Sequence, residues 1–324
     1  MKLSILKCHG SGNDFVLIDE TMESNGNIPD EKRASLTRAM CNREAGVGAD
    51  GVLFYQSSET ADCKMRMFNP DGGEAEMCGN GLRCIGRYCA ERLTRPDVTV
   101  ETMKSTLAVK GGKPLYAGVE TFEAEIGPVS TRPGALPMLV DTDSFAGESI
   151  EELSSDLVFT ALSVPNPHIV AIVDDIDEPL VERCGVRANH LRLFPSGVNV
   201  SLARRLGKNN IFVITYERGV GITYSCGTAM SASAYVSVIH GLSEAEEPIS
   251  VYNRGGLVEC DVKRDPSEHI LLKGNATFVF EAEIEVGKDY EEISGQYDKR
   301  VRMDEVSAYG AFQDYVESVL NEIT

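Results

Sequence analysis

The chain has 324 residues, 42% hydrophobic and 25% charged, which suits one large domain or two ordinary ones with a sizeable core. Its 50 acidic and 31 basic residues give a formal net charge of −19, which repels phosphate backbones and anionic lipid and argues against nucleic-acid and membrane-surface partners. No apolar run is long enough to span a bilayer, no secretion signal is evident, and nine cysteines are too sparse for a disulfide scaffold, so we expect reduced thiols in a cytoplasmic protein.

The first half is predicted to alternate short strands with two helices. The predicted strands occupy residues 2–7, 14–19, 51–55 and 64–68, with more short strands up to about residue 126. A helix is predicted over Asp30–Cys41 with Asp30 as its cap. A second is predicted over Gly81–Leu93, where apolar residues recur near helical spacing, and turns are expected at His9–Asn13 and Asn69–Gly73.

The second half follows a turn-rich joint at residues 127–137 and runs from about residue 124 to 275. Residues Thr228–His240 carry almost no charge, which predicts a helix buried on all sides. The last forty residues are strongly acidic and are predicted to end in a helix near residues 310–320.

The two halves resemble copies of each other. When Cys78 is aligned with Cys226, each is followed by Gly and a helix-like run, at an offset of 148 residues. Asn13 and Asn166, each opening an apolar run, align at an offset of 153, and the glycines of Gly48-Ala-Asp and Gly197-Val-Asn at 149. Three ordered landmarks at nearly one offset favour duplication, with one cysteine per half facing a shared cleft.

The position of each cysteine directly before a helix gives it a chemical use. The first-turn N–H groups and the helix dipole stabilise a thiolate, and the same groups bind a carboxylate. Cysteine is more often a packing residue, which we keep as the interpretation for the other seven, whereas for Cys78 and Cys226 the residues alone leave packing and chemistry equally open. From composition alone, His168 is more simply a loop histidine with its hydrogen bonds made. Glu217-Arg218 is either an ordinary ion pair or a pair whose arginine binds a substrate carboxylate.

A set of motifs, taken together, resembles the diaminopimelate epimerase family. The motifs appear in the family's order over about residues 1–280 and comprise Lys7-Cys-His-Gly-Ser-Gly-Asn-Asp-Phe15, Gly46-Val-Gly-Ala-Asp50, Met67-Phe-Asn-Pro-Asp-Gly-Gly-Glu74, Cys78-Gly-Asn-Gly-Leu-Arg83, Val164-Pro-Asn-Pro-His168, Gly197-Val-Asn-Val200, Tyr216-Glu-Arg-Gly219 and Ser225-Cys-Gly-Thr228. The chain is most similar to the longer form found in some low-GC Gram-positive bacteria.

The resemblance implies an α+β fold with two pseudo-symmetric lobes, each a mainly antiparallel sheet curled around a central helix. We accordingly divide the chain into residues 1–122 with Cys78, residues 123–275 with Cys226, and residues 276–324, a final strand returning to the first lobe plus an acidic helical tail.

The resemblance also implies site roles. Cys78 and Cys226 would be the acid/base thiols, and His168 and Glu217 would support them. The residues implied to bind substrate, Glu217 among them, are Asn13, Asn69, Gly79, Asn80, Asn166, Asn199, Glu217, Arg218, Gly227 and Thr228. The expected activity is cofactor-independent epimerisation of LL-2,6-diaminopimelate to meso-diaminopimelate in lysine and peptidoglycan precursor biosynthesis, with neither metal nor pyridoxal phosphate. The small-molecule substrate is the expected partner, and the sequence leaves the oligomeric state open, a homodimer included.

The sequence departs from the family pattern in three places. Gly51 stands where some members have Gln, Ala229-Met230 follows Gly227-Thr228 in place of Gly-Ala, and the acidic tail after about Val286 has no counterpart in shorter members. The first two leave substrate preference open, and the tail is most simply a solvated surface helix.

Three other functions stay open at this point. The chain could be another isomerase on the same scaffold, such as a proline or histidine racemase. It could instead bind an amino acid without catalysis, or use Cys78 and Cys226 as a redox sensor.

Overall fold

The computed structural model describes residues 1–75, 77–263, 269–294 and 297–322 of the chain. It forms two compact units: unit 1 consists of residues 1–124 and 274–315, and unit 2 of residues 125–273 and 316–324. Helices and strands mix in both, so the fold is α+β as predicted. None of the helices in these described ranges is long and apolar enough to cross a membrane.

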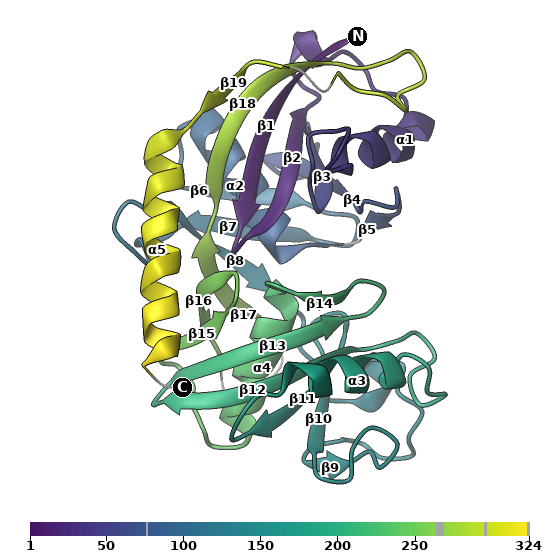
Figure 1. Ribbon diagram of the computed structural model, residues 1–324, viewed down its shortest axis with the longest axis vertical. Helices are drawn as coiled ribbons and strands as arrows, with labels where there is room; N and C mark the ends of the chain where they lie inside the picture. The colour runs from purple at the N-terminus through teal and green to yellow at the C-terminus, as the bar shows by residue number, and fades with distance from the viewer. Residues whose placement is uncertain (76, 264–268, 295–296, 323–324) are drawn as a thin grey trace. The chain divides into compact units, whose positions relative to one another are not determined.

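Unit 1 is a mixed sheet with a helix on each face (Figure 1). Its elements are β1 (Lys2–Gly10), β2 (Asn13–Asp19), a 3₁₀ turn (Glu23–Asn25), α1 (Asp30–Cys41), β3 (Gly51–Gln56), β4 (Cys63–Phe68), β5 (Glu74–Ala75), α2 (Gly79–Leu93), β6 (Asp97–Glu101), β7 (Thr106–Gly111), β8 (Thr121–Ile126), β18 (Thr277–Glu285), β19 (Lys299–Val301) and the start of α5 (Met303–Asn321). Strand β18 pairs antiparallel with β1, the first strand of the chain.

Alternation along the unit 1 strands explains why the sheet is covered on both faces. In β3, Leu53 and Tyr55 pack with α2, whereas Val52 and Phe54 pack with Leu36 of α1. A strand buried on both faces reads as a continuous apolar run, as β3 does. Helix α2 contacts β1, β4, β6 and β7 and is buried from Gly79 to Arg87, which makes it the central helix of the unit.

Unit 2 has the same kind of sheet around a second central helix. Its elements are a 3₁₀ turn (Pro133–Ala135), β9 (Glu148–Ser149), β10 (Val158–Ser163), β11 (Pro167–Val173), α3 (Glu178–Ala188), β12 (Asn199–Gly207), β13 (Asn210–Glu217), β14 (Gly221–Thr223), α4 (Gly227–Ile239), β15 (Ile249–Asn253), β16 (Gly256–Asp261) and β17 (Ile270–Asn275). Helix α4 contacts β10, β11, β12 and β13 and is buried on all sides from Gly227 to Ser237, as its lack of charge predicts.

The strand pairing of unit 1 recurs in unit 2. In unit 1, β1–β2 is antiparallel, β2–β3 parallel, β3–β4 antiparallel and β4–β6 parallel. In unit 2, β10–β11 is antiparallel, β11–β12 parallel, β12–β13 antiparallel and β13–β15 parallel. A helix follows the second strand of each series (α1 and α3), and another precedes the strand that pairs in parallel with the fourth (α2 and α4). The predicted duplication is therefore present in the topology.

The helices differ from the sequence prediction at three points. Helix α1 begins at Asp30 as its first helical residue, because Pro29 occupies the cap position and fixes the entering backbone. Helix α3 was not predicted, although Val181, Cys184 and Ala188 form a buried stripe.

The acidic tail is the third correction, because its helix is not simply solvated. Helix α5 begins at Met303, two turns before the predicted start near residue 310. Tyr309 and Phe312 are 6% and 0% exposed. Both rings pack within unit 1, Tyr309 against His9 and Phe312 against Tyr116.

Candidate active site

Cys78 occupies the cap position of α2 in unit 1. Its backbone is extended (φ −143°, ψ 113°), and no side chain caps the helix. No acidic residue lies in the first turn of α2. The start of the helix thus presents its positive dipole end directly beside the half-buried sulfur of Cys78.

Amide side chains from two elements meet at Cys78. The thiol of Cys78 lies 3.9 Å from Asn13 Oδ1, and Asn80 Nδ2 donates to the same oxygen at 3.2 Å. Asn13 Nδ2 donates to Asp50 Oδ2 at 3.0 Å. Because Asn13 opens β2 and Asp50 immediately precedes the paired strand β3, the sheet register sets the orientation of the Asn13 amide.

A buried arginine lies behind this group and was given no role by the sequence. Arg83 is fully buried, and its Nη2 donates to Asn80 Oδ1 at 2.8 Å while its Nε donates to the carbonyl of Asn275 at 3.1 Å. Gly10 and Gly274 make room for it, since a Cβ on either residue would lie within 2.9 Å of the guanidinium. The motif Cys78-Gly-Asn-Gly-Leu-Arg83 contained the residue, but its partner Asn275 is 192 residues away in sequence.

Cys226 occupies the matching position in unit 2. It caps α4 with extended backbone (φ −126°, ψ 110°), again with no side-chain cap and no acidic residue in the first turn. Its Sγ lies 3.4 Å from Thr228 Oγ1. Gly227 and Thr228 supply the first N–H groups of α4, in the same relation to Cys226 as Gly79 and Asn80 have to Cys78.

Burial keeps Cys226 protonated. The side chain is 8% exposed, and burial raises the pKa of its thiol well above the ordinary value, helped by the negative charge of Glu217. Hydrogen bonds from the Thr228 hydroxyl and the backbone of Ala229 oppose this rise but do not overcome it. The helix start thus fails to make Cys226 a thiolate, contrary to the lowering of pKa expected at a helix start, because desolvation outweighs the helix end.

His168 is held between two of the predicted asparagines. Its Nε2 lies 2.9 Å from Asn166 Oδ1 and 3.5 Å from Asn199 Nδ2. The ring is completely buried, and this burial, together with the charge of Arg218, lowers the pKa of His168 to about 3. His168 is therefore neutral near pH 7, and its Nε2–H donates to Asn166 Oδ1.

Glu217 ends strand β13 and Arg218 follows it, but their side chains have different partners. Glu217 accepts a hydrogen bond from Thr223 Oγ1 at 2.6 Å, and Arg218 Nη1 donates to the carbonyl of Ser196 at 2.8 Å. The backbone N–H of Arg218 donates to Asn199 Oδ1 at 2.9 Å. This last contact ties the exposed arginine to the His168 group.

Within each unit, most of the predicted site residues lie together. Unit 1 links Asn13, Cys78 and Asn80, whereas Asn69 is held in its own exposed turn, where its backbone bonds to Gly72 and Gly73. Unit 2 joins Asn166 with His168 and Asn199, Asn199 with Arg218, and Glu217 with Cys226.

The departures from the family pattern are accommodated by packing. A Cβ on Gly51 would lie 2.8 Å from the carbonyl oxygen of Phe68, so this backbone has no space for a side chain there. Met230 is buried in α4, where Asn253 Nδ2 approaches its sulfur at 2.6 Å.

Solved structures share this fold at low sequence identity. A Bacillus anthracis phenazine biosynthesis protein of the PhzF family aligns with a TM-score of 0.63 at 18% identity, covering 88% of this chain and all of that one. A hydroxyproline epimerase from Agrobacterium vitis, with bound trans-4-hydroxy-L-proline, aligns with a TM-score of 0.57 at 15% identity over 87% of this chain and 92% of its own. The chain thus has the fold of this group of proteins, which includes amino-acid epimerases.

Sequence comparison is more specific. The profile of the diaminopimelate epimerase family matches residues 5–113 and 160–279. A diaminopimelate epimerase of Clostridium acetobutylicum is 44% identical over 89% of this chain and 87% of its own length. One from Enterococcus faecalis is 38% identical over 98% of this chain and 99% of its own length. The chain belongs to the diaminopimelate epimerase family, as its motifs indicate.

Proposed function

We propose that this chain interconverts LL-2,6-diaminopimelate and meso-diaminopimelate, without a cofactor, through the thiols of Cys78 and Cys226. The observation that carries the proposal is the equivalent position of the two cysteines. Each occupies the N-cap position of a buried helix whose first N–H groups receive no side-chain cap, and the two helices occupy the same place in the two repeated strand arrangements. Family membership supplies the substrate class, since the relatives are named diaminopimelate epimerases.

The chemistry needs a base, an acid and a stabiliser of negative charge. The α-proton of an amino acid is a very weak acid, and its removal places negative charge on the carboxylate. In the proposal, the N–H groups of Gly79, Asn80, Gly227 and Thr228 hold that carboxylate. Helix starts suit this role because their N–H groups and dipoles favour anions and need no reorganisation during the reaction.

Inversion requires proton transfer on both faces of the carbon. One thiolate removes the proton and one thiol donates a proton from the other face, after which each sulfur has exchanged its protonation state. Because burial keeps Cys226 protonated, Cys226 would be the initial donor and Cys78 the initial base. For the reverse direction the roles exchange.

The remaining predicted residues would bind and orient. Asn13, Asn69, Asn166, Asn199 and Arg218 would hold chiefly the distal amino-acid end, and Glu217 the reacting α-amino group. His168 would contribute by orienting the amide of Asn166, since a neutral imidazole brings no positive charge.

The proposal includes the biological setting that the sequence favours. The reaction would serve lysine and peptidoglycan precursor biosynthesis in the cytoplasm. The homodimer belongs to the same proposal and is tested by light scattering of the purified protein.

Replacing either thiol tests the assignment. Cys78→Ala and Cys226→Ala should each lower net epimerisation by at least about 100-fold, since a positioned proton donor or acceptor contributes about 10²–10⁴-fold. Chiral chromatography of diaminopimelate, incubated with protein and a reductant but no cofactor, measures the change. Cys184→Ala is the matched control, because this buried cysteine lies in α3, where its thiol donates to the carbonyl of Leu153.

The same assay separates the alternatives. With proline or histidine supplied in place of diaminopimelate, conversion of either would make the chain another isomerase. Binding without conversion would make it an amino-acid-binding protein. Full activity of either variant would contradict the two-thiol assignment.

A further inference from the structure

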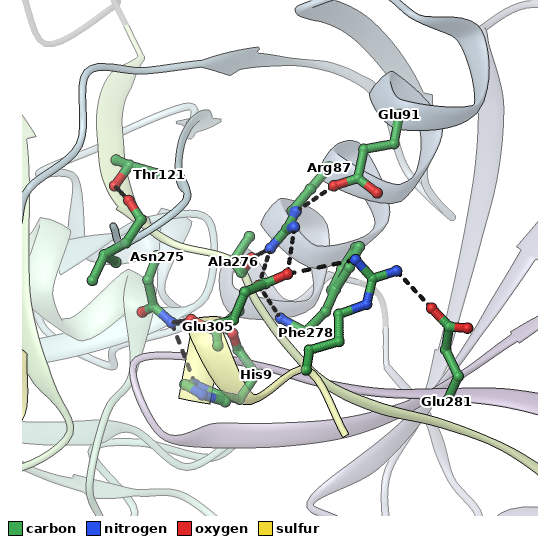
Figure 2. A network of polar contacts seen from close by, with 12 residues as sticks. His9, Arg87, Glu91, Thr121, Asn275, Ala276, Phe278, Glu281 and Glu305 are labelled. Atoms are coloured by element: carbon green, nitrogen blue, oxygen red, sulfur yellow. Dashed lines mark hydrogen bonds and ion pairs between the residues drawn. The ribbon is translucent and has the colours of Figure 1, made fainter. Parts of the chain in front are cut away.

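Helix α5 lies outside the residues that the family profile matches, which end at 279. Its first part nevertheless packs into unit 1 through buried polar and aromatic side chains, and Figure 2 shows the polar contacts of Glu305. These contacts reach α2, which Cys78 caps, and His9 in β1, close to the turn into β2, where Asn13 contacts Cys78.

The first contact is an ion pair with α2. Glu305 receives hydrogen bonds from Arg87 Nη1 at 2.5 Å and Nη2 at 2.9 Å, and it also accepts the backbone N–H of Phe278 at 2.9 Å. Arg87 is 4% exposed, so its charge needs a partner in the interior. Its other acidic partner, Glu91, has a side chain that is 46% exposed, against 16% for Glu305. Glu305 is therefore the main buried counter-charge of α2.

The second contact is with the end of β1, next to the turn that leads into β2 and Asn13. The ring of Tyr309 lies edge-on to the ring of His9, with 4.3 Å between centroids. Asn275 joins His9 to the same turn, since its Nδ2 lies 3.3 Å from His9 Nδ1 and its Oδ1 accepts from the backbone N–H of Ser11 at 2.6 Å. Burial lowers the pKa of His9 to about 4, so the ring is neutral and can accept this hydrogen bond.

Both contacts connect to Cys78 through residues already described. Arg87 Nη1 and Arg83 Nε donate to the successive carbonyls of Ala276 and Asn275, which fixes α2 against this segment. Arg83 then holds Asn80, and Asn80 and Cys78 share the oxygen of Asn13. Arg87 lies eight residues, or about 12 Å of helix, beyond Gly79, so Glu305 acts by fixing the helix and not by its field at the sulfur.

We propose that α5 is a positioning element for the Cys78 half of the site, with Glu305 and Tyr309 as the positioning residues. The role in catalysis rests on the proposed function, whereas the effect on Cys78 itself does not. The acidic tail is then part of the catalytic unit and not a solvated appendage.

The test compares Glu305→Gln with Asp304→Asn in the full chain. The two variants remove one negative charge from adjacent residues of α5, but Asp304 is exposed. We expect Glu305→Gln to lower kcat about 10- to 100-fold, since a small misplacement of a reacting group costs about that much. Asp304→Asn should stay within twofold of wild type.

The rate of iodoacetamide alkylation at Cys78, followed by peptide mass spectrometry, supplies the readout that a merely structural role would not move. In Glu305→Gln the rate at Cys78 should change at least fivefold, while the rate at Cys226 in the same sample stays within twofold. Equal changes at both thiols would indicate general loosening and overturn the proposal, as would wild-type rates at both.

A second variant keeps the proposal testable if Glu305→Gln does not fold. Tyr309→Leu keeps a large apolar side chain but removes the ring contact with His9, and it should give the same selective change at Cys78. If wild type does not epimerise diaminopimelate, the proposed function fails while the alkylation result still decides the positioning role. If wild type is active and neither variant alters Cys78, only the positioning role fails.

Discussion

At the scale of single residues, burial decides the charge states of the candidate site. The family resemblance implies roles for Cys226 and His168, but their protonation depends chiefly on how deeply the fold buries them. Desolvation keeps Cys226 as a thiol and His168 as a neutral imidazole. The sequence could not show this, because the strands and helix that enclose these groups meet only in the fold.

The depressed pKa of His168 makes stability depend on pH. Below pH 6.5 the unfolded chain binds a proton at this residue that the folded chain does not bind. The contribution of His168 to the free energy of unfolding is therefore complete above pH 6.5 and is lost as the pH falls towards 3. The loss from this residue should reach about 2–3 kcal/mol by pH 4.5.

Urea unfolding at pH 7.0, 6.0, 5.0 and 4.5 measures the effect. His168→Gln should lose less free energy of unfolding on acidification than wild type. Part of the loss that remains in this variant should come from buried His9, whose pKa is also lowered. Replacement of the exposed His190 by Gln should keep the wild-type dependence. An unchanged pH dependence in His168→Gln would contradict a neutral buried imidazole.

At the scale of elements, local sequence predicted some helices well and others poorly. Helix α4 was predicted within one residue at each end, because a helix-length run with almost no charge is stable only when it is buried in the interior. The start of α5 was missed although Val306, Tyr309 and Phe312 recur at helical spacing, since the acidic composition of the tail suggested solvent. Its ion pair with Arg87 joins residues 218 positions apart, beyond any local pattern.

Close packing of α2 on β7 gives a prediction at this scale. A Cβ at Gly86 would lie within 2.6 Å of Val109 Cβ, so α2 would have to move away from the sheet. Gly86→Ala should destabilise the protein by about 1–3 kcal/mol, the usual cost of overpacking, despite the better helix propensity of Ala. Thermal unfolding measures this, with Gly134→Ala as the control, because nothing lies within 4 Å of that glycine. Equal midpoints for the two variants would contradict the packing account.

At the scale of the whole molecule, duplication was the most informative sequence signal. The offsets between Cys78 and Cys226 and between Gly48 and Gly197 correspond to equivalent points in the two series of strand pairings. A duplicated fold can be recognised from the order and spacing of a few motifs even when few residues of the two halves are identical. The residues around the two thiols do not show this regularity. Asn13 lies beside the first thiol, and Arg83 holds the neighbouring Asn80, whereas Thr228 and Glu217 lie beside the second.

The central claim is that two thiols, one from each unit, exchange protons with opposite faces of one carbon. The most direct test is conversion of LL-diaminopimelate in deuterated water, stopped at low conversion, with deuterium located by mass spectrometry after chiral separation. A thiol holds one proton, so the base returns the original hydrogen to the substrate while the other thiol delivers solvent deuterium to the product. We predict deuterium at the inverted centre of meso-diaminopimelate and almost none in the recovered LL isomer. A product that retains its original hydrogen, or equal early labelling of both isomers, would contradict the two-thiol account.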